Sequence, residues 1–334
     1  MTPLLSLKTF LRVSTRPARN IFREMFILVA TSLKWILDKK ILPLEEAHKE
    51  LYFNIHRTSW NILKKFPNLT DCRDFNDRIQ WLKLFDQCED IIRCSDKILV
   101  REYIREKVGG QYLTLVYQIC ESFKDIDFDS LPNAFVIKTN HDSGSVVLVR
   151  NKVLLDKNAI ELAINKALST RFGWEYGEWA YAYIRRKVFV EEYISSNQEE
   201  PPPDYKFYVV NGQVKFIHYI YNRGIDTAEQ TLNSEGMDLK TELYTSFKYG
   251  HAFIKPACWD EMKRIAVKLA SDFKCVRVDL FESQGRIYVG ELTFWPMFGC
   301  YKGEGQKILG HYLDFDRATF KTPIYHRVLT SNLK

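Results

Sequence analysis

Two short apolar runs near the end of the sequence, VRVDLFESQGRIYVGELTF at residues 276–294, carry the residue types best suited to chemistry. A tight Gln-Gly turn separates the runs and predicts a β-hairpin. Alternation places Arg277 and Asp279 on one face of the first strand, and it places Glu291 and Thr293 on one face of the second. Carboxylates on paired strands can hold Mg²⁺, and the arginine can stabilise phosphate charge. A cross-strand ion pair at the surface is the alternative.

A second candidate is FVIKTNHDSGSVVLV at residues 135–149, where an apolar run ends in Lys138 and a polar loop follows. A lysine at the end of a buried strand is unfavourable unless an anion meets it. Gly144 lets the backbone approach a ligand, and loop amides can bind phosphate oxygens. The spacing is that of neither a P-loop nor a dinucleotide-binding turn. An exposed hairpin with a solvated lysine is the alternative interpretation.

Two further strands end in, or alternate with, polar residues. In KVFVEEYI (187–194) acidic residues follow an apolar run directly, so backbone groups there could contact an adenine edge, or the residues form a solvated strand end. In DYKFYVVNG (204–212) alternation puts Asp204, Lys206 and Tyr208 on one face. A polar face on a sheet strand indicates either solvent or a site, and both interpretations stay open.

The elements that must position these residues follow from periodicity. Residues 45–125 are mainly helical in pattern, with 75–86 as one helix and 95–109 as another, capped by Ser95 or Asp96 and stopped by Gly109. From residue 135 onward the pattern changes to short runs typical of β-strands. Strands are predicted at 135–139, 146–150, 187–193, 206–210, 214–221, 276–282 and 286–292. Two helices are predicted among them, at 156–169 and 259–273. The sequence predicts an α+β fold with antiparallel sheets.

Composition sets outer bounds on the function. The 334 residues are 46% apolar, and the net charge of +6 favours anionic partners only weakly. No Lys/Arg block with interleaved aromatic residues argues for nucleic acid, so none is expected as a partner. The seven cysteines form no C-x-x-C pair, which is typical of reduced, packed thiols in a cytoplasmic protein.

Residues 1–40 differ from the rest of the chain, because eight Lys or Arg residues stand there against only Glu24 and Asp38. The apolar stretch at 26–37 is too short to span a bilayer. A basic amphipathic helix containing Trp35 could lie on an anionic membrane surface, as a peripheral contact at the inner face of the cytoplasmic membrane. A helix packed on the protein body is the alternative.

The ordered set of these motifs resembles the ATP-grasp superfamily, and more narrowly the TupA-like (teichuronopeptide-biosynthesis) ATP-grasp family. The resemblance extends over residues 75–295 and rests on the stretches SDKILVREYIREKVGGQYL, IDFDSLPNAFVIKTNHDSG, VFVEEYI, DYKFYVVNG and VRVDLFESQGRIYVGELTF. It implies an ATP-grasp fold, in which two α+β subdomains with antiparallel sheets grip ATP behind a mainly helical N-terminal region. The implied divisions are 1–44 (basic segment), 45–130 (helical region), 131–190 (lid subdomain) and 191–334 (core subdomain with tail).

The resemblance also implies the site residues. Lys206 and Arg277 would meet the γ-phosphate or the acyl intermediate, and Asp279, Glu291 and Thr293 would hold Mg²⁺. The expected ATP-binding residues are Lys97, Lys138, His141, Ser143, Gly144, Ser145, Glu191, Glu192 and Ile194, with the backbone of Glu191 and Ile194 at the adenine. Two positions depart from the common pattern: Thr293 stands where many ATP-grasp proteins have Asn, and Asp142 stands where the loop commonly has Gly.

The activity implied is an ATP- and Mg²⁺-dependent carboxylate–amine ligase that forms an amide through an acyl phosphate. The carboxylate would be a uronic acid of a cell-surface polysaccharide, and the amine an amino acid or another amino compound. Two alternatives stay open at this point: a glycosyltransferase of polysaccharide biosynthesis, and a non-catalytic nucleotide-binding protein.

Overall fold

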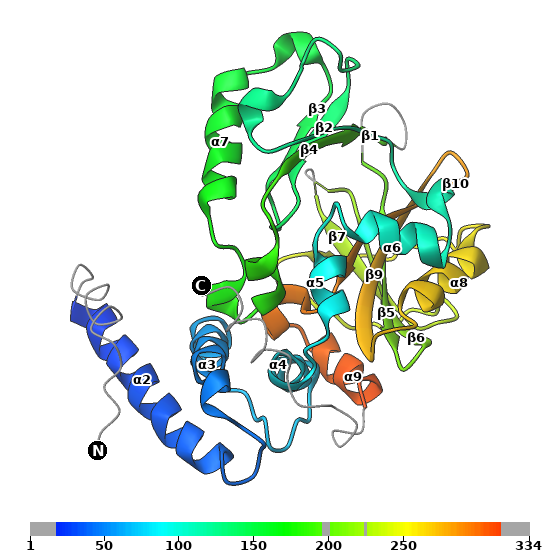
Figure 1. Ribbon diagram of the computed structural model, residues 1–334. Helices are drawn as coiled ribbons and strands as arrows, with labels where there is room; N and C mark the ends of the chain where they lie inside the picture. The colour runs from blue at the N-terminus through cyan, green and yellow to red at the C-terminus, as the bar shows by residue number, and fades with distance from the viewer. Residues whose placement is uncertain (1–17, 196–200, 224–225, 315–334) are drawn as a thin grey trace.

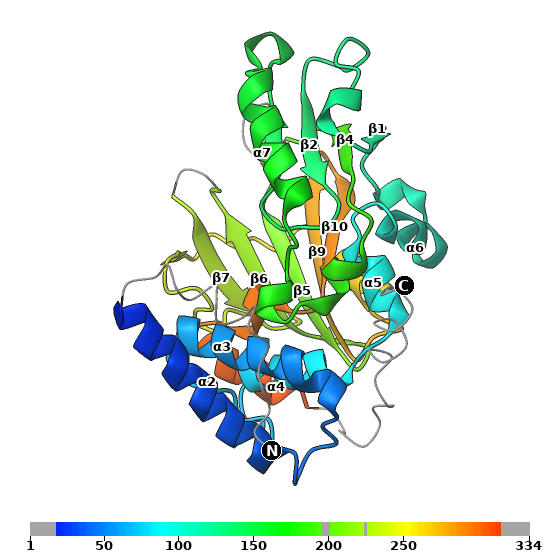
Figure 2. The ribbon, with the colours of Figure 1, turned by 60° about the vertical axis from the view of Figure 1, so that its left-hand side comes forward.

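The computed structural model describes residues 18–195, 201–223 and 226–314, and Figure 1 shows a helical N-terminal part followed by two β-sheets. The helices ahead of the sheets are α2 (Ala18–Asp38), α3 (Lys49–Leu63), α4 (Phe75–Phe85), α5 (Glu89–Ser95) and α6 (Val100–Lys107). Helix α2 runs along the outside of the molecule (Figures 1 and 2), whereas nearly every residue of α4 is buried. The predicted helical region ahead of antiparallel sheets is confirmed.

The small sheet has four strands in the order β1-β4-β2-β3, and all of its pairs are antiparallel. Its strands are β1 (Val116–Cys120), β2 (Phe135–Thr139), β3 (Val146–Val149) and β4 (Val188–Glu192). Helix α7 (Lys157–Ser169) covers one face, where Phe135, Ile137 and Ile164 belong to a separate apolar cluster. Val136 and Lys138 alternate onto the other face.

The large sheet has six strands in the order β10-β9-β5-β6-β7-β8, antiparallel except for the short β7–β8 pair. Its strands are β5 (Asp204–Val210), β6 (Gln213–Tyr221), β7 (Ala228–Leu232), β8 (Lys248–Tyr249), β9 (Cys275–Ser283) and β10 (Arg286–Thr293). Helix α8 (Trp259–Leu269) covers one face, where Trp259 packs against Phe207 with ring centroids 5.6 Å apart. Helices α4 and α9 (Gly305–Tyr312) cover one end of the opposite face, where Phe75 meets Tyr208.

Both predicted hairpin turns form. In each, the two central residues have positive φ: Asn211 (48°) with Gly212 (73°), and Gln284 (55°) with Gly285 (79°). This is the type I′ turn, whose twist matches that of the flanking strands. These turns fix the register of β5 with β6 and of β9 with β10.

The single helix predicted at 95–109 is wrong at its start. Helix α5 ends at Ser95 and α6 begins at Val100, because the Asp96 carboxylate accepts hydrogen bonds from the backbone N–H groups of Ile98 (2.8 Å) and Leu99 (3.3 Å). These bonds hold a turn that presents Lys97 to the space between the sheets. Gly109 ends the segment as expected, with a φ of 103°.

The small sheet crosses the segment boundaries implied by the resemblance. Strand β1 comes from the 45–130 segment, yet it pairs with β4, which ends two residues beyond position 190. The four-segment division stays a prediction. Among the helices that the structure describes, none combines the length and the apolar character needed to cross a bilayer.

Candidate active site

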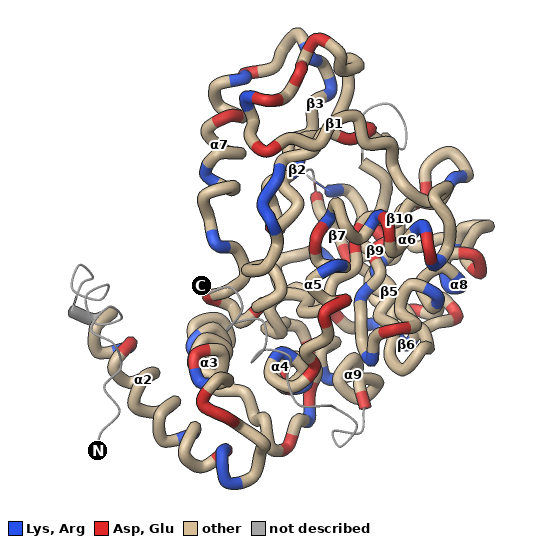
Figure 3. Tube along the Cα trace, in the orientation of Figure 1, with Lys and Arg blue, Asp and Glu red and all other residues tan. Residues whose placement is uncertain are grey.

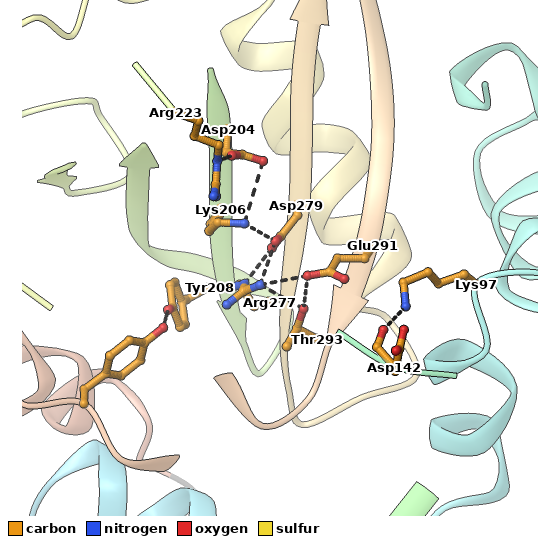
Figure 4. Close-up of polar contacts among 11 residues, drawn as sticks. Lys97, Asp142, Asp204, Lys206, Tyr208, Arg223, Arg277, Asp279, Glu291 and Thr293 are labelled. Atoms are coloured by element: carbon orange, nitrogen blue, oxygen red, sulfur yellow. Dashed lines mark hydrogen bonds and ion pairs between the residues drawn. The ribbon is translucent and has the colours of Figure 1, made fainter. Parts of the chain in front are cut away.

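The chemically active face of the large sheet is assembled from three neighbouring strands. Asp279 on β9 lies opposite Lys206 on β5 and Glu291 on β10, and Arg277 lies opposite Thr293. Directly paired residues share a face of a sheet, so all five side chains project to the same side. Figure 4 shows them converging.

A β-bulge at Gly290 makes this convergence possible. The hairpin pairs regularly from Ser283–Arg286 as far as Leu280–Val289, and continued regular pairing would set Glu291 opposite Val278. One extra residue enters between Val289 and Glu291, so Glu291 pairs with Asp279 instead. Because a shift of one residue exchanges the two faces of a strand, the bulge brings Glu291 and Thr293 onto the Asp279 face.

The Arg277 guanidinium is the centre of the cluster. Its Nε and Nη2 donate to the two oxygens of Asp279 at 2.6 and 2.7 Å, and Nη2 also donates to Glu291 Oε1 at 3.1 Å and to Thr293 Oγ1 at 3.0 Å. Lys206 Nζ donates to the same Asp279 carboxylate from the neighbouring strand. A two-pronged arginine–carboxylate pair is strong and fixed in direction, so the cluster is set before any ligand arrives.

Neighbouring charges keep this cluster ionised despite its burial. Arg277, Asp279 and Lys206 are only 7%, 3% and 6% exposed. Burial acts to raise the pKa of Asp279, but Arg277 and Lys206 outweigh it and lower that pKa to about 2. Both cations have a second carboxylate nearby, because Arg277 also contacts Glu291 and Lys206 Nζ lies 3.8 Å from Asp204, so their positions are fixed on more than one side.

The residues present fit a magnesium ion. Asp279 and Glu291 place carboxylate oxygens on one face, and the Glu291 side chain is 40% exposed and therefore accessible. Within the described parts of the chain, no three His, Cys, Asp or Glu residues form a ready metal cluster. A metal held by two carboxylates must complete its shell with phosphate oxygens and water, as Mg²⁺ characteristically does.

The small sheet contributes a second set of charges. Lys138 Nζ pairs with the Glu191 carboxylate, which also accepts a 2.7 Å hydrogen bond from Thr114 Oγ1 and lies 3.8 Å from Arg101 Nη1. Glu192 accepts from the backbone N–H of Leu115 at 3.2 Å. The carboxylates of the 187–194 motif therefore have protein partners.

Lys97 links the two sets. Its backbone N–H donates to the Asn140 carbonyl at 3.0 Å, and its Nζ donates to the carbonyl of Asp142 (Figure 4). Burial lowers the pKa of Lys97, while the Glu291 and Asp142 carboxylates raise it and Lys138 lowers it. Lys97, Lys138 and Glu291 thus lie within electrostatic reach of one another, although they come from separate parts of the chain.

The 139–145 loop holds its own aspartate inward. The Asp142 carboxylate accepts from the hydroxyls of Thr139 and Ser145, which removes the expected conflict between this aspartate and a phosphate. Gly144 has a φ of 102°, and a Cβ built on it would meet no atom within 4 Å. Ser143 is exposed beside it. This part of the loop is open for backbone contact with an anion.

Two of the expected ATP-binding residues lie away from the charged cluster. The His141 ring is buried against α7, with Nε2 3.2 Å from the Ala167 carbonyl, and burial lowers its pKa. This position suits a ring that anchors the loop to α7. Ile194 lies two residues beyond the end of β4, whereas Glu191 is flanked by strands on both sides.

Sequence reasoning missed Glu178, in the aromatic segment WEYGEWAYAY at residues 174–183. This side chain is only 5% exposed, and within the described residues its carboxylate receives no hydrogen bond. Burial raises its pKa to about 8, with the Lys83 cation opposing and Glu291 adding to the shift. An acidic residue in a segment with five aromatic ones was the available signal, because neighbouring aromatic side chains desolvate a carboxylate.

A buried polar network supports the cluster from below. Tyr208, which pairs with Arg277 across β5 and β9, has its hydroxyl 2.6 Å from that of Tyr301. His218, opposite Lys206 on β6, lies 2.5 Å from the Glu229 carboxylate. Alternation in the sequence placed Tyr208 on the same face as Lys206, whereas Tyr301, His218 and Glu229 were not distinguishable from ordinary core residues.

The sequence profile of the TupA-like ATP-grasp family matches residues 77–314. The chain belongs to the TupA-like ATP-grasp family. The match confirms the resemblance and carries it through residues 296–314, a stretch that includes α9 and to which the motifs had assigned no role. The ATP-grasp fold expected from the sequence is therefore confirmed, and the family is one of ATP-dependent ligases.

Solved structures of ATP-grasp ligases resemble this ATP-grasp protein at low identity. They include the D-alanine–D-alanine ligase of Bacillus anthracis in complex with ATP (17% identity, TM-score 0.36, covering 60% of this chain and 54% of that one). The ligase PsnB with a precursor variant, Mg and ADP is 16% identical, with a TM-score of 0.40 over 67% of this chain and 59% of that one. An L-amino acid ligase from Bacillus licheniformis is 14% identical, with a TM-score of 0.36 over 66% of this chain and 43% of that one. The chain thus spans about half the length of these structures, and no curated protein matches it.

Proposed function

We propose that this ATP-grasp protein is an ATP-dependent carboxylate–amine ligase. The observation that carries the proposal is the preformed cluster of Arg277, Lys206 and Asp279 beside the half-exposed Glu291, facing the Gly144 loop. Phosphoryl transfer needs little covalent help from the protein, so positioning and charge neutralisation supply most of the catalysis. Buried cations held in fixed positions next to carboxylates suited to Mg²⁺ provide both.

The reaction has two steps. An oxygen of the substrate carboxylate attacks the γ-phosphorus of ATP, an acyl phosphate forms, and ADP leaves. The nitrogen of the amine then attacks the acyl carbon, inorganic phosphate leaves, and the nitrogen loses a proton to give the amide. The first step makes the carboxylate electrophilic, and the exclusion of water protects the acyl phosphate from hydrolysis.

Each group in the site has a place in this scheme. Lys206 and Arg277 neutralise the γ-phosphate and the acyl-phosphate oxygens. Lys97 and Lys138 exchange their present protein partners for phosphate oxygens, and the backbone of the 139–145 loop closes over them. The backbone after β4, at Glu191 and Ile194, contacts adenine. Asp279 and Glu291, with Thr293 beside them, hold Mg²⁺, which when bound neutralises phosphate charge.

The carboxylate substrate we propose is a uronic acid of a cell-surface polysaccharide, and the amine is an amino acid or another amino compound. The TupA-like family resemblance supports this choice. The site itself supports only the coarser class, a carboxylate activated by ATP.

The direct experiment measures ADP and phosphate release from ATP and Mg²⁺ with uronic-acid glycosides crossed against a panel of amines. We expect ADP formation that requires both an acid and an amine, with a stoichiometric amide product. Transfer from a sugar nucleotide without ATP cleavage would establish a glycosyltransferase instead. Tight ATP binding with no turnover for any pair would establish a non-catalytic nucleotide-binding protein.

The metal assignment has its own test. Glu291→Gln keeps the size of a side chain that is 40% exposed, so the fold should be unaffected. We expect Mg²⁺-dependent turnover to be abolished while the circular dichroism and the melting temperature stay those of the wild type. Unchanged turnover would remove Glu291 from the metal site.

A further inference from the structure

Helix α2 has two apolar faces, and only one of them is covered. The inner face packs on the protein through Ile27, Thr31 and Trp35, which are 4%, 0% and 6% exposed. Trp35 meets Tyr52 edge-on with ring centroids 5.0 Å apart, and Asp38 accepts a 2.8 Å hydrogen bond from the Tyr52 hydroxyl. The sequence leaves two placements open for the helix that contains Trp35, a membrane surface or the protein body, and the Trp35 ring itself is part of the core.

The outer face of α2 consists of Phe22, Met25, Val29, Leu33, Ile36 and Leu37, which are 53–73% exposed. Their spacing of three or four residues places them along one side of the helix, opposite the buried stripe. Eight of the nineteen large apolar side chains exposed in the described structure lie between positions 22 and 41. Single exposed apolar residues are ordinary, but a continuous stripe of this kind marks an interaction surface.

The charges around this face are basic. Lys39 and the exposed Lys40 stand at its end, and Arg23 near its start, with side-chain exposures of 43% for Lys39 and 41% for Arg23. Three of the cations have acidic partners: Arg23 pairs with Glu24 and Lys39 with Glu46, each at 3.2 Å, and Lys34 pairs with the buried Asp38 at 3.1 Å. Between positions 20 and 40 four basic residues stand against Glu24 and Asp38, so the helix and its end keep an excess of two positive charges (Figure 3). An apolar stripe with basic residues at its flanks is the pattern of a helix that lies in the interface of an anionic bilayer.

We propose that the outer face of α2 binds this protein to an anionic membrane surface, with the helix axis parallel to the bilayer. The inner face keeps its contacts with α3 while the outer side chains enter the interface between headgroups and acyl chains. The geometry excludes an orientation in which α2 spans the bilayer, because the opposite side of the same helix is buried against the protein. Thr31 is fully buried there, and Asp38 accepts the hydrogen bond from Tyr52.

A second copy of the chain fits this face less well. A helix of 21 residues is about 31 Å long, and a stripe roughly 10 Å wide offers about 300 Å². Stable protein interfaces bury about 800 Å² on each partner. An antiparallel pairing of two such helices would also bring Arg23 of one copy towards Lys39 and Lys40 of the other, which is repulsive.

The inference does not depend on the ligase reaction, since it rests on α2 alone. The experiment is co-sedimentation of the full chain with phosphatidylcholine vesicles, with and without phosphatidylserine. We expect binding to the anionic vesicles that weakens as salt is added, and little binding to the neutral ones. Absence of binding to either kind of vesicle would overturn the proposal.

A triple variant tests whether the outer face is responsible: Val29→Ser, Leu33→Ser and Ile36→Ser together. The matched control removes three apolar side chains elsewhere that are at least as exposed, Val153→Ser, Leu154→Ser and Leu162→Ser, which are 86%, 81% and 74% exposed. We expect at least about a tenfold loss of vesicle affinity for the α2 variant and no change for the control. Equal binding by the two variants would contradict the assignment.

Two further measurements separate the remaining outcomes. Lys39→Gln with Lys40→Gln should weaken binding to anionic vesicles several-fold and reduce its salt dependence.

Light scattering of wild-type protein and the α2 triple variant shows whether the outer face of α2 joins two copies of the chain instead. If the wild type is a dimer, the triple variant is a monomer and neither binds vesicles, the proposal is wrong, and the outer face of α2 instead binds a second copy of the chain.

Discussion

The two sheets carry the same kinds of charge in different settings. On the large sheet Lys206, Arg277 and Asp279 are 3–7% exposed and fixed by a two-pronged pair. On the small sheet the Lys138 side chain is 27% exposed, although its partner Glu191 is buried. The first group is rigid before ligand arrives, whereas the second can exchange its partner for a phosphate at a smaller penalty.

The difference follows from the size of the two sheets, since Lys138 on β2 and Glu191 on β4 lie on interior strands as well. Strands β9 and β5 are interior strands of a six-stranded sheet, so each residue there has neighbours on both sides. Strand β3 is an edge strand, and two of its four residues are exposed. The small sheet also has its own apolar cluster, separate from the main core. The large sheet therefore holds its charged residues rigidly, whereas the small sheet holds similar residues more loosely.

Asp279→Asn should give the largest effect. It removes the buried carboxylate that Arg277 and Lys206 share and leaves them only the more exposed Glu291 and Asp204, which lowers the unfolding free energy by about 3–5 kcal/mol and abolishes turnover. The matched change on the small sheet is Glu191→Gln. This change leaves Lys138 free to reach solvent, and it should lower the unfolding free energy by only about 1–2 kcal/mol. Urea denaturation measures both, and equal losses would contradict the contrast between the sheets.

Lysine replacements should separate chemistry from binding. We expect Lys206→Met to lower kcat by roughly 10²–10³, because it removes a fixed cation from the developing charge. Lys138→Met should instead weaken ATP binding about tenfold while kcat falls less. Steady-state kinetics with ATP as the varied substrate distinguishes these patterns, and a kcat loss as large for Lys138→Met as for Lys206→Met would place both in the same role.

Two glycines offer a smaller, matched comparison. Gly144 (φ 102°) in the small sheet's loop and Gly285 (φ 79°) in the β9–β10 turn both have open space where a Cβ would stand. Replacement of either by Ala adds only backbone strain, about 1–2 kcal/mol. We expect Gly285→Ala to lower the melting temperature without changing ATP affinity. For Gly144→Ala we expect a similar loss of melting temperature together with weaker ATP binding, and equal ATP affinities of the two variants in titration calorimetry would contradict this.

A further effect depends on pH. Burial raises the pKa of Glu178 from an ordinary 4.5 to about 8, so its protonated form is favoured by folding. The protonated carboxyl group makes its full contribution to the unfolding free energy below about pH 4.5. This contribution is lost as the pH rises towards 8, and the unfolding free energy then falls by at most about 1.4 kcal/mol per pH unit. Glu178→Gln should therefore match the wild type at pH 5 and become relatively more stable by pH 9. A pH-independent difference in melting temperature would show that burial does not govern this carboxyl group.

Much of the framework followed from local pattern. Alternation located the main sheet strands, the Asn-Gly and Gln-Gly pairs set both type I′ turns, and Asp96 signalled a cap. The cap proved to end one helix and begin another, because its hydrogen bonds hold a turn rather than a continuous helix. Strands β1, β7 and β8 and helix α9 were missed, since none of them has a strong pattern of its own.

The amino-acid sequence by itself determined the chemistry that is available: a lysine in each of two strands, two carboxylates and an arginine on one hairpin, and a glycine in an open loop. Tertiary structure decided which of them meet. The Gly290 bulge reverses the face of Glu291, and the α5–α6 turn carries Lys97 to a loop more than 40 residues away. Tertiary packing also decided that Trp35 is covered while the opposite side of α2 is not. Local periodicity records which residues share a face, but only packing determines which face is buried, because burial depends on partners that are distant in the chain.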